Sequence, residues 1–188
     1  MEKKLARNFI SKEFINLPAE ERNSLDQKIL INFIEAFPDM KDMNIGSYLS
    51  IDSEVKSTSI NQFLLSQNTN LYLPKIVDYE SKKLNFFLYS SAEDMLKNKY
   101  GICEPSNKNK SIPIKKLDLI IIPLRAINMN FTRLGFGGGY YDSSLKGITK
   151  NKCIGLCYEF QRLNKINTEK HDLELGGIIT PNGYFKKS

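Results

Sequence analysis

The sequence has no tryptophan, one histidine and three cysteines, and it lacks any apolar run long enough to cross a membrane. Its longest such run covers residues 119–124, whereas a spanning helix needs about 20 apolar residues. The first residues interleave charges with hydrophobic side chains and form no signal-peptide core. We therefore expect a cytoplasmic protein with no membrane partner.

Scarcity of cysteine and histidine excludes several kinds of site. Cys103, Cys153 and Cys157 cannot all pair within one chain, and none belongs to a C-x-x-C motif. We predict three buried thiols in a reducing compartment. His171 adjoins Asp172 without a recognisable nucleophile, and H-E-x-x-H is absent, so neither a hydrolytic triad nor a zinc site is supported.

The charge balance leaves the class of partner open. Lys and Arg number 27 against 21 Asp and Glu, which gives a net charge of +6 over 188 residues. Lysines are dispersed without a dense basic block, a distribution that favours a solvated surface over a nucleic-acid face. The length and the absence of repeats or long linkers predict a single domain over residues 1–188. We expect no nucleic-acid partner and a monomer.

Two amphipathic helices are predicted at the start of the chain. Residues 2–16 place apolar side chains at helical spacing, and Pro18 ends this helix. A second helix begins after Pro18, with acids in its first turn, and reaches Pro38. The inward positions are predicted to be Ala6, Phe9, Ile10, Phe14 and Leu17 in the first helix, and Leu25, Ile29, Phe33 and Phe37 in the second.

Short apolar runs typical of strands follow these helices. They cover residues 44–50, 70–77, 83–89, 117–123, 152–158 and 176–180, and a third helix is expected within 57–67. The continuous run 119–122 suits a strand covered on both faces. We predict an α/β fold, a three-layer α/β/α domain with a central parallel or mixed sheet.

The glycine-rich segment 133–142 carries the clearest chemical signal. Glycines at 135, 137, 138 and 139 let the backbone adopt positive φ and bring N–H groups close to an anion. A helix over 140–146 would add free N–H groups to the same point. The Walker and dinucleotide patterns both fail here, because no Gly-Lys pair occurs and Tyr140 replaces the last small residue.

Five charged side chains could complete a nucleotide site. Arg133 can hold phosphate oxygens, and Asp142 can hold the Mg²⁺ that accompanies ATP. Lys3 and Arg7 are four residues apart and would project from one helix face. Glu54 follows a predicted strand end, where ligands bind in open α/β sheets. Lys3, Arg7 and Glu54, each taken alone, are also compatible with solvated surface charges, whereas Arg133 and Asp142 beside the glycines favour a phosphate site.

The collinear set of these motifs resembles the 5-formyltetrahydrofolate cyclo-ligase family, also called 5,10-methenyltetrahydrofolate synthetase. The matching pieces are Lys3-x-x-x-Arg7, Tyr48-Leu-Ser with Glu54, Leu73-Pro-Lys75, Gly101-Ile-Cys-Glu-Pro105, Asp118-Leu-Ile-Ile-Ile-Pro123, residues 133–142, Tyr158-Glu-Phe-Gln161, and Glu169-Lys-His-Asp172. The chain departs from the family pattern just before the glycines, at Leu124, Ile127, Asn128, Phe131 and Thr132.

The resemblance implies a reaction and a set of roles. The reaction is ATP-dependent closure of 5-formyltetrahydrofolate to 5,10-methenyltetrahydrofolate with release of ADP and phosphate, and Lys3, Arg7 and Arg133 carry its catalytic charges. Implied Mg²⁺ ligands are Asp142 and Asp172, and implied folate contacts are Leu49, Glu54, Phe136, Gly137, Gly138, Gly139 and Tyr140. Implied ATP contacts are Lys3, Arg7, Arg133, Leu134, Gly135, Phe136, Gly137, Gly138, Gly139, Tyr140 and Tyr141.

Two other functions fit some of the same features. A different phosphoryl-binding α/β enzyme, such as a sugar-phosphate isomerase or a CoA-transferase-like protein, would act without ATP turnover. A basic nucleic-acid-binding protein would grip backbone phosphate with the glycines, and its binding would fall steeply with salt. The dispersed lysines make the nucleic-acid reading the weaker of the two.

Overall fold

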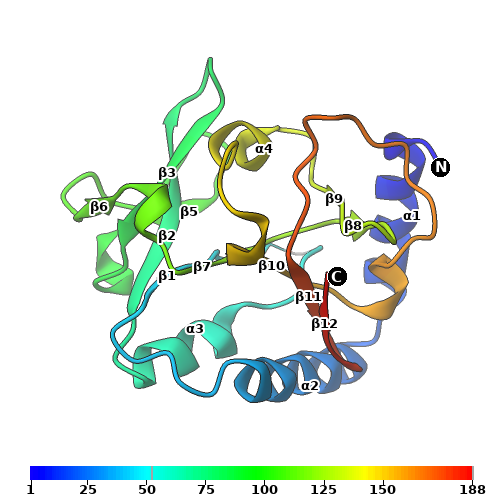
Figure 1. Ribbon diagram of the computed structural model, residues 1–188, viewed down its shortest axis with the longest axis horizontal. Coiled ribbons are helices and arrows are strands. Elements are labelled where there is room, and N and C mark those ends of the chain that lie inside the picture. Colours follow the sequence, from blue (N-terminus) through cyan, green and yellow to red (C-terminus); the bar gives the residue numbers. More distant parts are fainter. Residues whose placement is uncertain (52, 188) are drawn as a thin grey trace.

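A computed structural model describes residues 1–51 and 53–187, and an eight-stranded sheet forms its centre (Figure 1). The strand order is β12-β11-β10-β7-β1-β2-β3-β6. The strands are β1 (Asn44–Gly46), β2 (Asn70–Asp78), β3 (Lys83–Leu88), β6 (Ser111–Ile112), β7 (Leu119–Ile122), β10 (Cys153–Leu156), β11 (Gly177–Thr180) and β12 (Gly183–Lys186).

The middle of this sheet is parallel and its edges are antiparallel. Strands β11, β10, β7, β1 and β2 pair in parallel, whereas β12, β3 and β6 join antiparallel. The predicted α/β class with a mixed central sheet is confirmed. Parallel order places the carboxyl ends of β1 and β7 side by side, which is where open α/β sheets bind ligands.

Strand β7 shows why the sheet needs cover on both faces. Leu119 and Ile121 point into one hydrophobic core, and Ile120 and Ile122 point into the other. All four side chains are at most 4% exposed. Burying apolar surface on both sides stabilises the strand by roughly 25 cal/mol per Å² removed from water.

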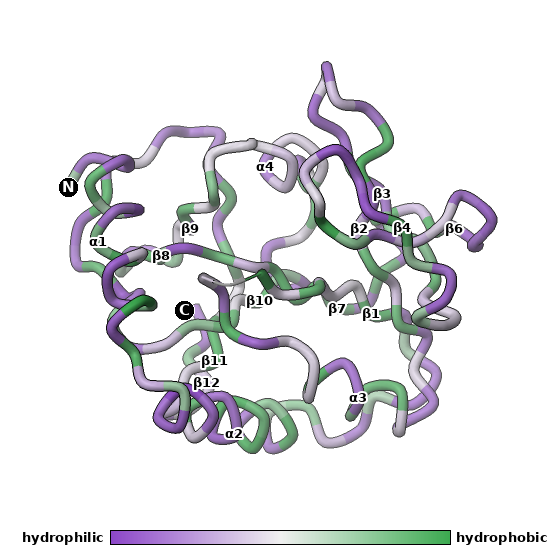
Figure 2. Tube along the Cα trace, turned by 180° about the vertical axis from the view of Figure 1, so that it is seen from behind, coloured by the Kyte–Doolittle hydropathy of each residue, from purple (hydrophilic) through white to green (hydrophobic). Residues whose placement is uncertain are grey.

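Helices α1 (Lys3–Asn16), α2 (Ala19–Ala36) and α3 (Thr58–Ser66) contribute to the core that contains Leu119. Figure 2 shows hydrophobic and hydrophilic residues alternating along α2, as expected for a helix with one buried face. The inward prediction was wrong for Phe9, which is 40% exposed. Helix α1 buries only the narrow stripe Ala6, Ile10 and Phe14, so Phe9 at the stripe's edge stays in solvent. No described helix is long and apolar enough to cross a membrane.

Short elements on both faces of the sheet complete the described part of the chain. Helix α4 (Tyr140–Ser144) packs near β3, and four 3-10 turns occupy Ala92–Asp94, Ile114–Lys116, Lys150–Lys152 and Glu159–Gln161. Two small hairpins pair β4 (Met95–Lys97) with β5 (Cys103–Pro105), and β8 (Ala126–Ile127) with β9 (Arg133–Leu134). The sequence predicted neither hairpin.

Cys103 corrects the prediction of three buried thiols. Cys153 and Cys157 are buried, but Cys103 is exposed. It lies on β5, outside the main sheet, where alternate side chains of a two-stranded ribbon face solvent.

Phe131, one of the positions that depart from the family pattern, lies in the turn through which the chain enters the glycine segment. Its φ is 61°, in the left-handed region that glycine adopts freely. The Asn128 side chain holds this turn, because its Oδ1 accepts the N–H groups of Asn130 and Thr132, both at 2.9 Å. The Phe131 ring packs against the second core, so side-chain burial offsets the backbone cost.

Candidate active site

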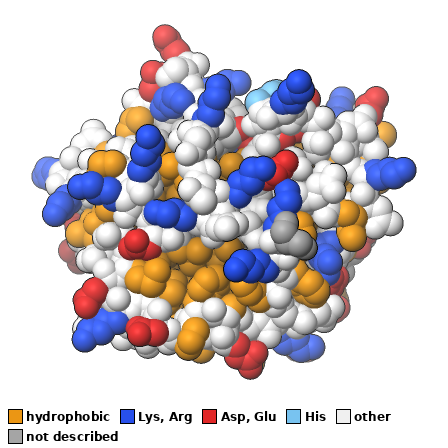
Figure 3. Space-filling model, in the orientation of Figure 1, with side chains coloured by type: hydrophobic (Ala, Val, Ile, Leu, Met, Phe, Trp, Pro, Cys, Tyr) orange, Lys and Arg blue, Asp and Glu red, His pale blue; other side chains and the backbone are white. Residues whose placement is uncertain are grey.

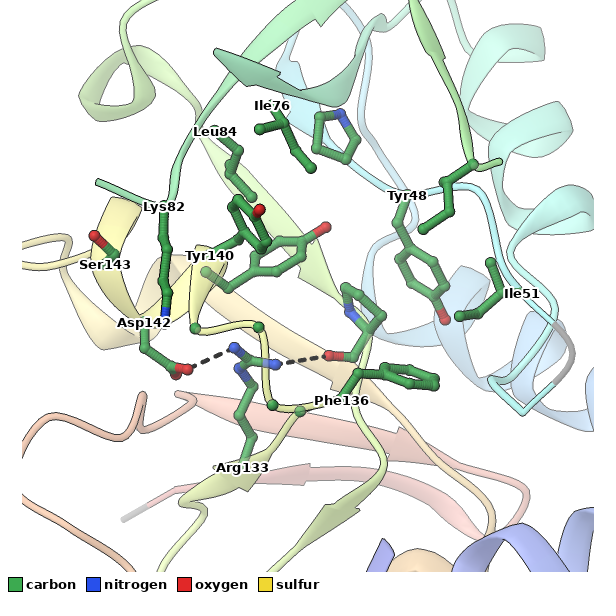
Figure 4. A pocket seen from close by; sticks show the side chains of 18 of the residues that line it. Tyr48, Ile51, Ile76, Lys82, Leu84, Arg133, Phe136, Tyr140, Asp142 and Ser143 are labelled. Atoms are coloured by element: carbon green, nitrogen blue, oxygen red, sulfur yellow. Dashed lines mark hydrogen bonds and ion pairs between the residues drawn. The ribbon is translucent and has the colours of Figure 1, made fainter. Parts of the chain in front are cut away.

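A cleft of about 740 Å³ opens at the carboxyl ends of β1 and β7. Its walls come from the start of α1, the segments that follow β1 and β7, the β2–β3 hairpin, β5 and the glycine loop, which we define as residues 135–139. This volume is within the range of about 300–1,000 Å³ that small-molecule sites occupy. Figure 4 shows labelled side chains from the loop after β1, the β2–β3 hairpin and residues 133–143 converging on the same space.

The cleft gathers every residue to which the sequence analysis gave a role. Segments far apart in the chain supply them, from α1, the loop after β1, the glycine-rich segment and the loop before β11. The residues are Lys3, Arg7, Leu49, Glu54, Arg133, Leu134, Gly135, Phe136, Gly137, Gly138, Gly139, Tyr140, Tyr141, Asp142 and Asp172. Their individual roles stay predictions.

The glycine loop lines the cleft in an unusual backbone conformation. Gly137 and Gly139 have φ values of 106° and 74°, which residues with a Cβ adopt only with strain. Among described residues, no hydrogen-bond acceptor faces the backbone N–H groups of residues 135–139. Such a run of free N–H groups is a ready anion-binding site.

Arg133 lies beneath this loop and is only 5% exposed. Its Nη2 is 3.1 Å from Asp142 Oδ1, and its Nη1 donates to the Pro123 carbonyl at 3.2 Å (Figure 4). Its Nε is buried without a partner among the described residues, and its guanidinium lies 5.2 Å from the centre of the Tyr141 ring. The ion pair holds the cation in place and leaves a donor unused.

The start of α1 contributes the other cations. Lys3 Nζ contacts Asp172 Oδ2 at 2.8 Å and Glu169 Oε1 at 2.9 Å. Burial alone would lower the Lys3 pKa, but these two carboxylates raise it above its ordinary value, so the ammonium stays charged. Arg7 Nε donates to the Gly135 carbonyl at 2.8 Å, which ties α1 to the glycine loop.

The two predicted metal ligands lie close together. Asp142 Oδ1 accepts the N–H of Leu173, the neighbour of Asp172, at 3.1 Å. Over residues 1–51 and 53–187, no group of three or more His, Cys, Asp and Glu side chains could hold a metal. The assignment of Asp142 and Asp172 to Mg²⁺ stays a prediction, since Mg²⁺ commonly takes only one or two protein carboxylates and completes its octahedron with water and substrate phosphates.

Glu54 is a buried acid, 4% exposed, that lines the cleft. Burial raises its pKa to about 7, against the opposing effects of the Ile51 N–H, 3.0 Å from Oε2, and the Arg125 and Arg133 charges. Buried acids with strongly shifted pKa values concentrate at functional sites.

The cleft is electropositive. Its described residues include seven Lys and Arg side chains against four carboxylates. On the face seen in Figure 3, Lys and Arg side chains are spread among uncharged groups. An excess of positive charge in a concave site favours anionic ligands.

A model of the 5-formyltetrahydrofolate cyclo-ligase family matches residues 1–181. The chain belongs to the 5-formyltetrahydrofolate cyclo-ligase family. The family resemblance noted in the sequence is thereby confirmed.

Individual members of the family cover nearly the whole chain. The 5-formyltetrahydrofolate cyclo-ligase of Haemophilus influenzae is 32% identical over 176 residues, which are 92% of this chain and 94% of that protein. The solved 5,10-methenyltetrahydrofolate synthetase of Aquifex aeolicus superimposes with a TM-score of 0.84 at 27% identity, covering 98% of this chain and 92% of that one. The synthetase of Mycoplasma pneumoniae gives a TM-score of 0.77 at 26% identity, covering 96% and 99%.

One wall of the cleft received no role from the sequence. Lys75 Nζ pairs with Glu104 Oε1 at 2.8 Å, and Asn98 Nδ2 donates to Glu104 Oε2 at 3.1 Å, which fixes the β4–β5 hairpin against β2. The hydroxyls of Tyr100 and Tyr140 lie 3.0 Å apart and link this hairpin to α4. The cyclo-ligase motifs 73–75 and 101–105 contain part of this wall, but only the fold joins them.

Proposed function

We propose that this cleft binds ATP and 5-formyltetrahydrofolate together and closes the formyl group onto nitrogen 10 of the folate. Membership of the family makes the chain an ATP-dependent enzyme of folate and one-carbon metabolism. The observation that carries the assignment of the site is the convergence of the glycine loop, Arg133, Lys3, Arg7 and Glu54 on one cavity. Family membership also favours this reaction over the isomerase, CoA-transferase and nucleic-acid alternatives.

The proposed reaction has two steps. The formyl oxygen attacks the γ-phosphorus of ATP and ADP leaves, so that a poor leaving group becomes phosphate. Nitrogen 10 then attacks the formyl carbon and loses its proton, and phosphate departs with the original formyl oxygen. Phosphoryl transfer depends chiefly on positioning and charge neutralisation, and it needs no protein nucleophile.

In this proposal the glycine loop and the cations bind the triphosphate. The free N–H groups of residues 135–139 receive phosphate oxygens, and the buried Arg133 guanidinium supplies positive charge below them. Lys3 and Arg7 add charge from α1. The Lys3, Arg7 and Arg133 side chains are each held by contacts within the protein, so little reorganisation is needed when charge moves onto the transferred group.

Asp142 and Asp172 are proposed to hold Mg²⁺. A bound Mg²⁺ would neutralise phosphate charge and orient the γ-phosphoryl group. Asp142 pairs with Arg133 and Asp172 pairs with Lys3, so these two cations hold the two carboxylates in position.

The folate is proposed to lie toward Leu49, Glu54 and the aromatic side chains within and just after the glycine loop. A carboxylate accepts hydrogen bonds from the N–H groups of a pterin ring, and it would repel a triphosphate. Phe136 and Tyr140, which line the cleft, offer ring faces for stacking.

Replacing Asp142 or Asp172 with asparagine is expected to raise the Mg²⁺ concentration needed for half-maximal activity by at least about tenfold, because loss of even an outer metal partner costs about 10–100-fold. Titration of activity with Mg²⁺ at fixed ATP measures this. Glu169→Gln is the matched control, because Glu169 also pairs with Lys3 but is not a proposed metal ligand. If the Mg²⁺ titration curves of both variants overlay the parent curve, Asp142 and Asp172 have structural roles and do not bind the metal.

The assay for the function is the absorbance of 5,10-methenyltetrahydrofolate formed by purified protein from 5-formyltetrahydrofolate and Mg·ATP. Product should form only when ATP is present. Cyclisation at the same rate without ATP, or no cyclisation with it, would contradict the proposal.

We further propose that the chain acts as a single-domain, cytoplasmic monomer without a nucleic-acid partner. All proposed ligand contacts come from one chain, and the three cysteines are free thiols, which fits a reducing compartment. Sedimentation of the purified protein tests the oligomeric state.

A further inference from the structure

Arg125 is a buried cation behind the cleft. It lies in the β8–β9 region, is 3% exposed, and is not among the described residues that line the cleft. Its Nη1 donates to the Ser53 carbonyl at 3.2 Å, and its Nη2 donates to the Arg7 carbonyl at 3.1 Å and to the Ser11 hydroxyl. Its guanidinium also lies 4.8 Å from the centre of the Phe136 ring.

These contacts reach three separate segments of the site. Ser53 precedes Glu54, the Arg7 carbonyl belongs to the α1 residue that holds the glycine loop, and Phe136 is part of that loop. The five-donor fork of arginine can serve all three at once, which a lysine ammonium cannot do with the same geometry. The side chain therefore joins parts of the site that the sequence places far apart.

The charge of Arg125 also bears on Glu54. Burial lowers the pKa of Arg125, the Glu54 carboxylate raises it, and Arg7 lowers it further. The hydrogen-bond partners of Arg125 are neutral oxygens, so Glu54 is the acid whose negative charge favours the charged form of the buried Arg125 side chain.

We propose that Arg125 is a positioning residue that ties the Glu54, Arg7 and Phe136 segments together and places a buried positive charge near the Glu54 carboxylate that binds the folate. This proposal rests on the proposed role of Glu54 in folate binding. Arg125 acts through Glu54 and does not touch the substrate itself.

Arg125 is not the only charged or titratable group close to Glu54. Arg133 lowers the Glu54 pKa as Arg125 does, and the two neighbouring phenols stay neutral because their own pKa values are raised. The Glu54 backbone carbonyl accepts a hydrogen bond from Arg22 Nη2, on α2, at 2.8 Å. The charged and titratable groups facing Glu54 are thus Arg22, Tyr48, Arg125, Arg133 and Tyr141.

The test compares pH profiles of kcat/KM for 5-formyltetrahydrofolate at saturating ATP. Arg125→Gln should lower this value about tenfold at pH 7 and shift the acidic limb upward by roughly half a pH unit or more, so that the deficit shrinks toward pH 8.5. Arg125→Lys keeps the charge and should keep the limb near its original position. Arg162→Gln is the control, because Arg162 also stacks on a phenylalanine and pairs with Glu159 outside the cleft.

Amide hydrogen exchange of the unliganded proteins tests whether Arg125 holds these segments together, and it requires no measurement of enzyme activity. Exchange in 49–56 and 134–138 should be faster in both Arg125 variants than in the parent, and unchanged there in Arg162→Gln. Parent-like exchange in both segments would overturn the positioning role, even if an Arg125 variant were less stable overall.

Glu54→Gln separates this inference from the role of Glu54. If Glu54→Gln removes the acidic limb while Arg125→Gln leaves the limb in place, Glu54 keeps its role and the Arg125 proposal fails. If Glu54→Gln leaves the limb and the folate kinetics unchanged, Glu54 does not bind folate and both proposals fail. Loss of the limb in Glu54→Gln together with its upward shift in Arg125→Gln supports both.

Discussion

Arg133→Ala is expected to lower kcat/KM for ATP by roughly 30-fold to several thousand-fold, because truncating a buried, hydrogen-bonded charge costs about 2–5 kcal/mol. Two effects act together. The phosphate loses the positive charge beneath the glycine loop, and the Asp142 carboxylate, 3.1 Å from Arg133 Nη2, loses its cation. Steady-state titration with ATP at saturating folate measures the loss.

Arg133→Lys is the informative companion to this variant. It keeps a positive charge but cannot hold both Asp142 and the Pro123 carbonyl in the arginine geometry, so an intermediate loss is expected. Thermal melting of both variants separates misfolding from loss of ATP binding. A folded Arg133→Ala protein with parent kcat/KM for ATP would remove Arg133 from the site.

Glu54→Gln is expected to lower kcat/KM for 5-formyltetrahydrofolate by about 10–100-fold, the range for losing a hydrogen bond to a charged group, with little change in ATP binding. The substitution keeps the shape of the side chain and removes its charge. Separate titrations with folate and with ATP measure the split. A selective loss of ATP affinity would reverse the assignment of Glu54.

The same variant should be more stable than the parent at alkaline pH. Folding raises the Glu54 pKa from 4.5 to about 7, so the parent loses stability as pH rises through this interval. Glutamine does not titrate and escapes the loss, which gives an advantage of about 1–3 kcal/mol at pH 8 that vanishes near pH 4.5. Urea unfolding across this range measures it, with Glu159→Gln as the control for an amide outside the cleft. A constant difference between Glu54→Gln and parent at all pH values would contradict the shifted pKa.

The elements that were predicted correctly have a local signal. Helices α1, α2 and α3 follow from apolar spacing and the breaks at Pro18 and Pro38, and β7 follows from an uninterrupted apolar run. The glycine loop was predictable for a similar reason, because closely spaced glycines have few uses other than an unusual backbone. Its neighbours Arg133 and Asp142 then suggested phosphate and metal.

The parts that were missed depend on pairing between distant segments. Strand β12 and the β4–β5 hairpin are short, and their strand conformation depends more on their hydrogen-bond partners than on their own composition. Glu104 looks like a surface acid until the hairpin brings it to Lys75. Arg125 looks like a surface charge until α1 and the loop after β1 close around it. No periodicity in the sequence encodes such contacts.

The most direct test of the proposed chemistry follows the formyl oxygen. 5-Formyltetrahydrofolate carrying oxygen-18 in the formyl group is converted with Mg·ATP, and the phosphate released is analysed by mass spectrometry. If the formyl oxygen accepts the γ-phosphoryl group, one phosphate forms per methenyl product and that phosphate carries the label. Label that appears in water while the phosphate stays unlabelled would contradict formyl activation by phosphoryl transfer, even if cyclisation itself were observed.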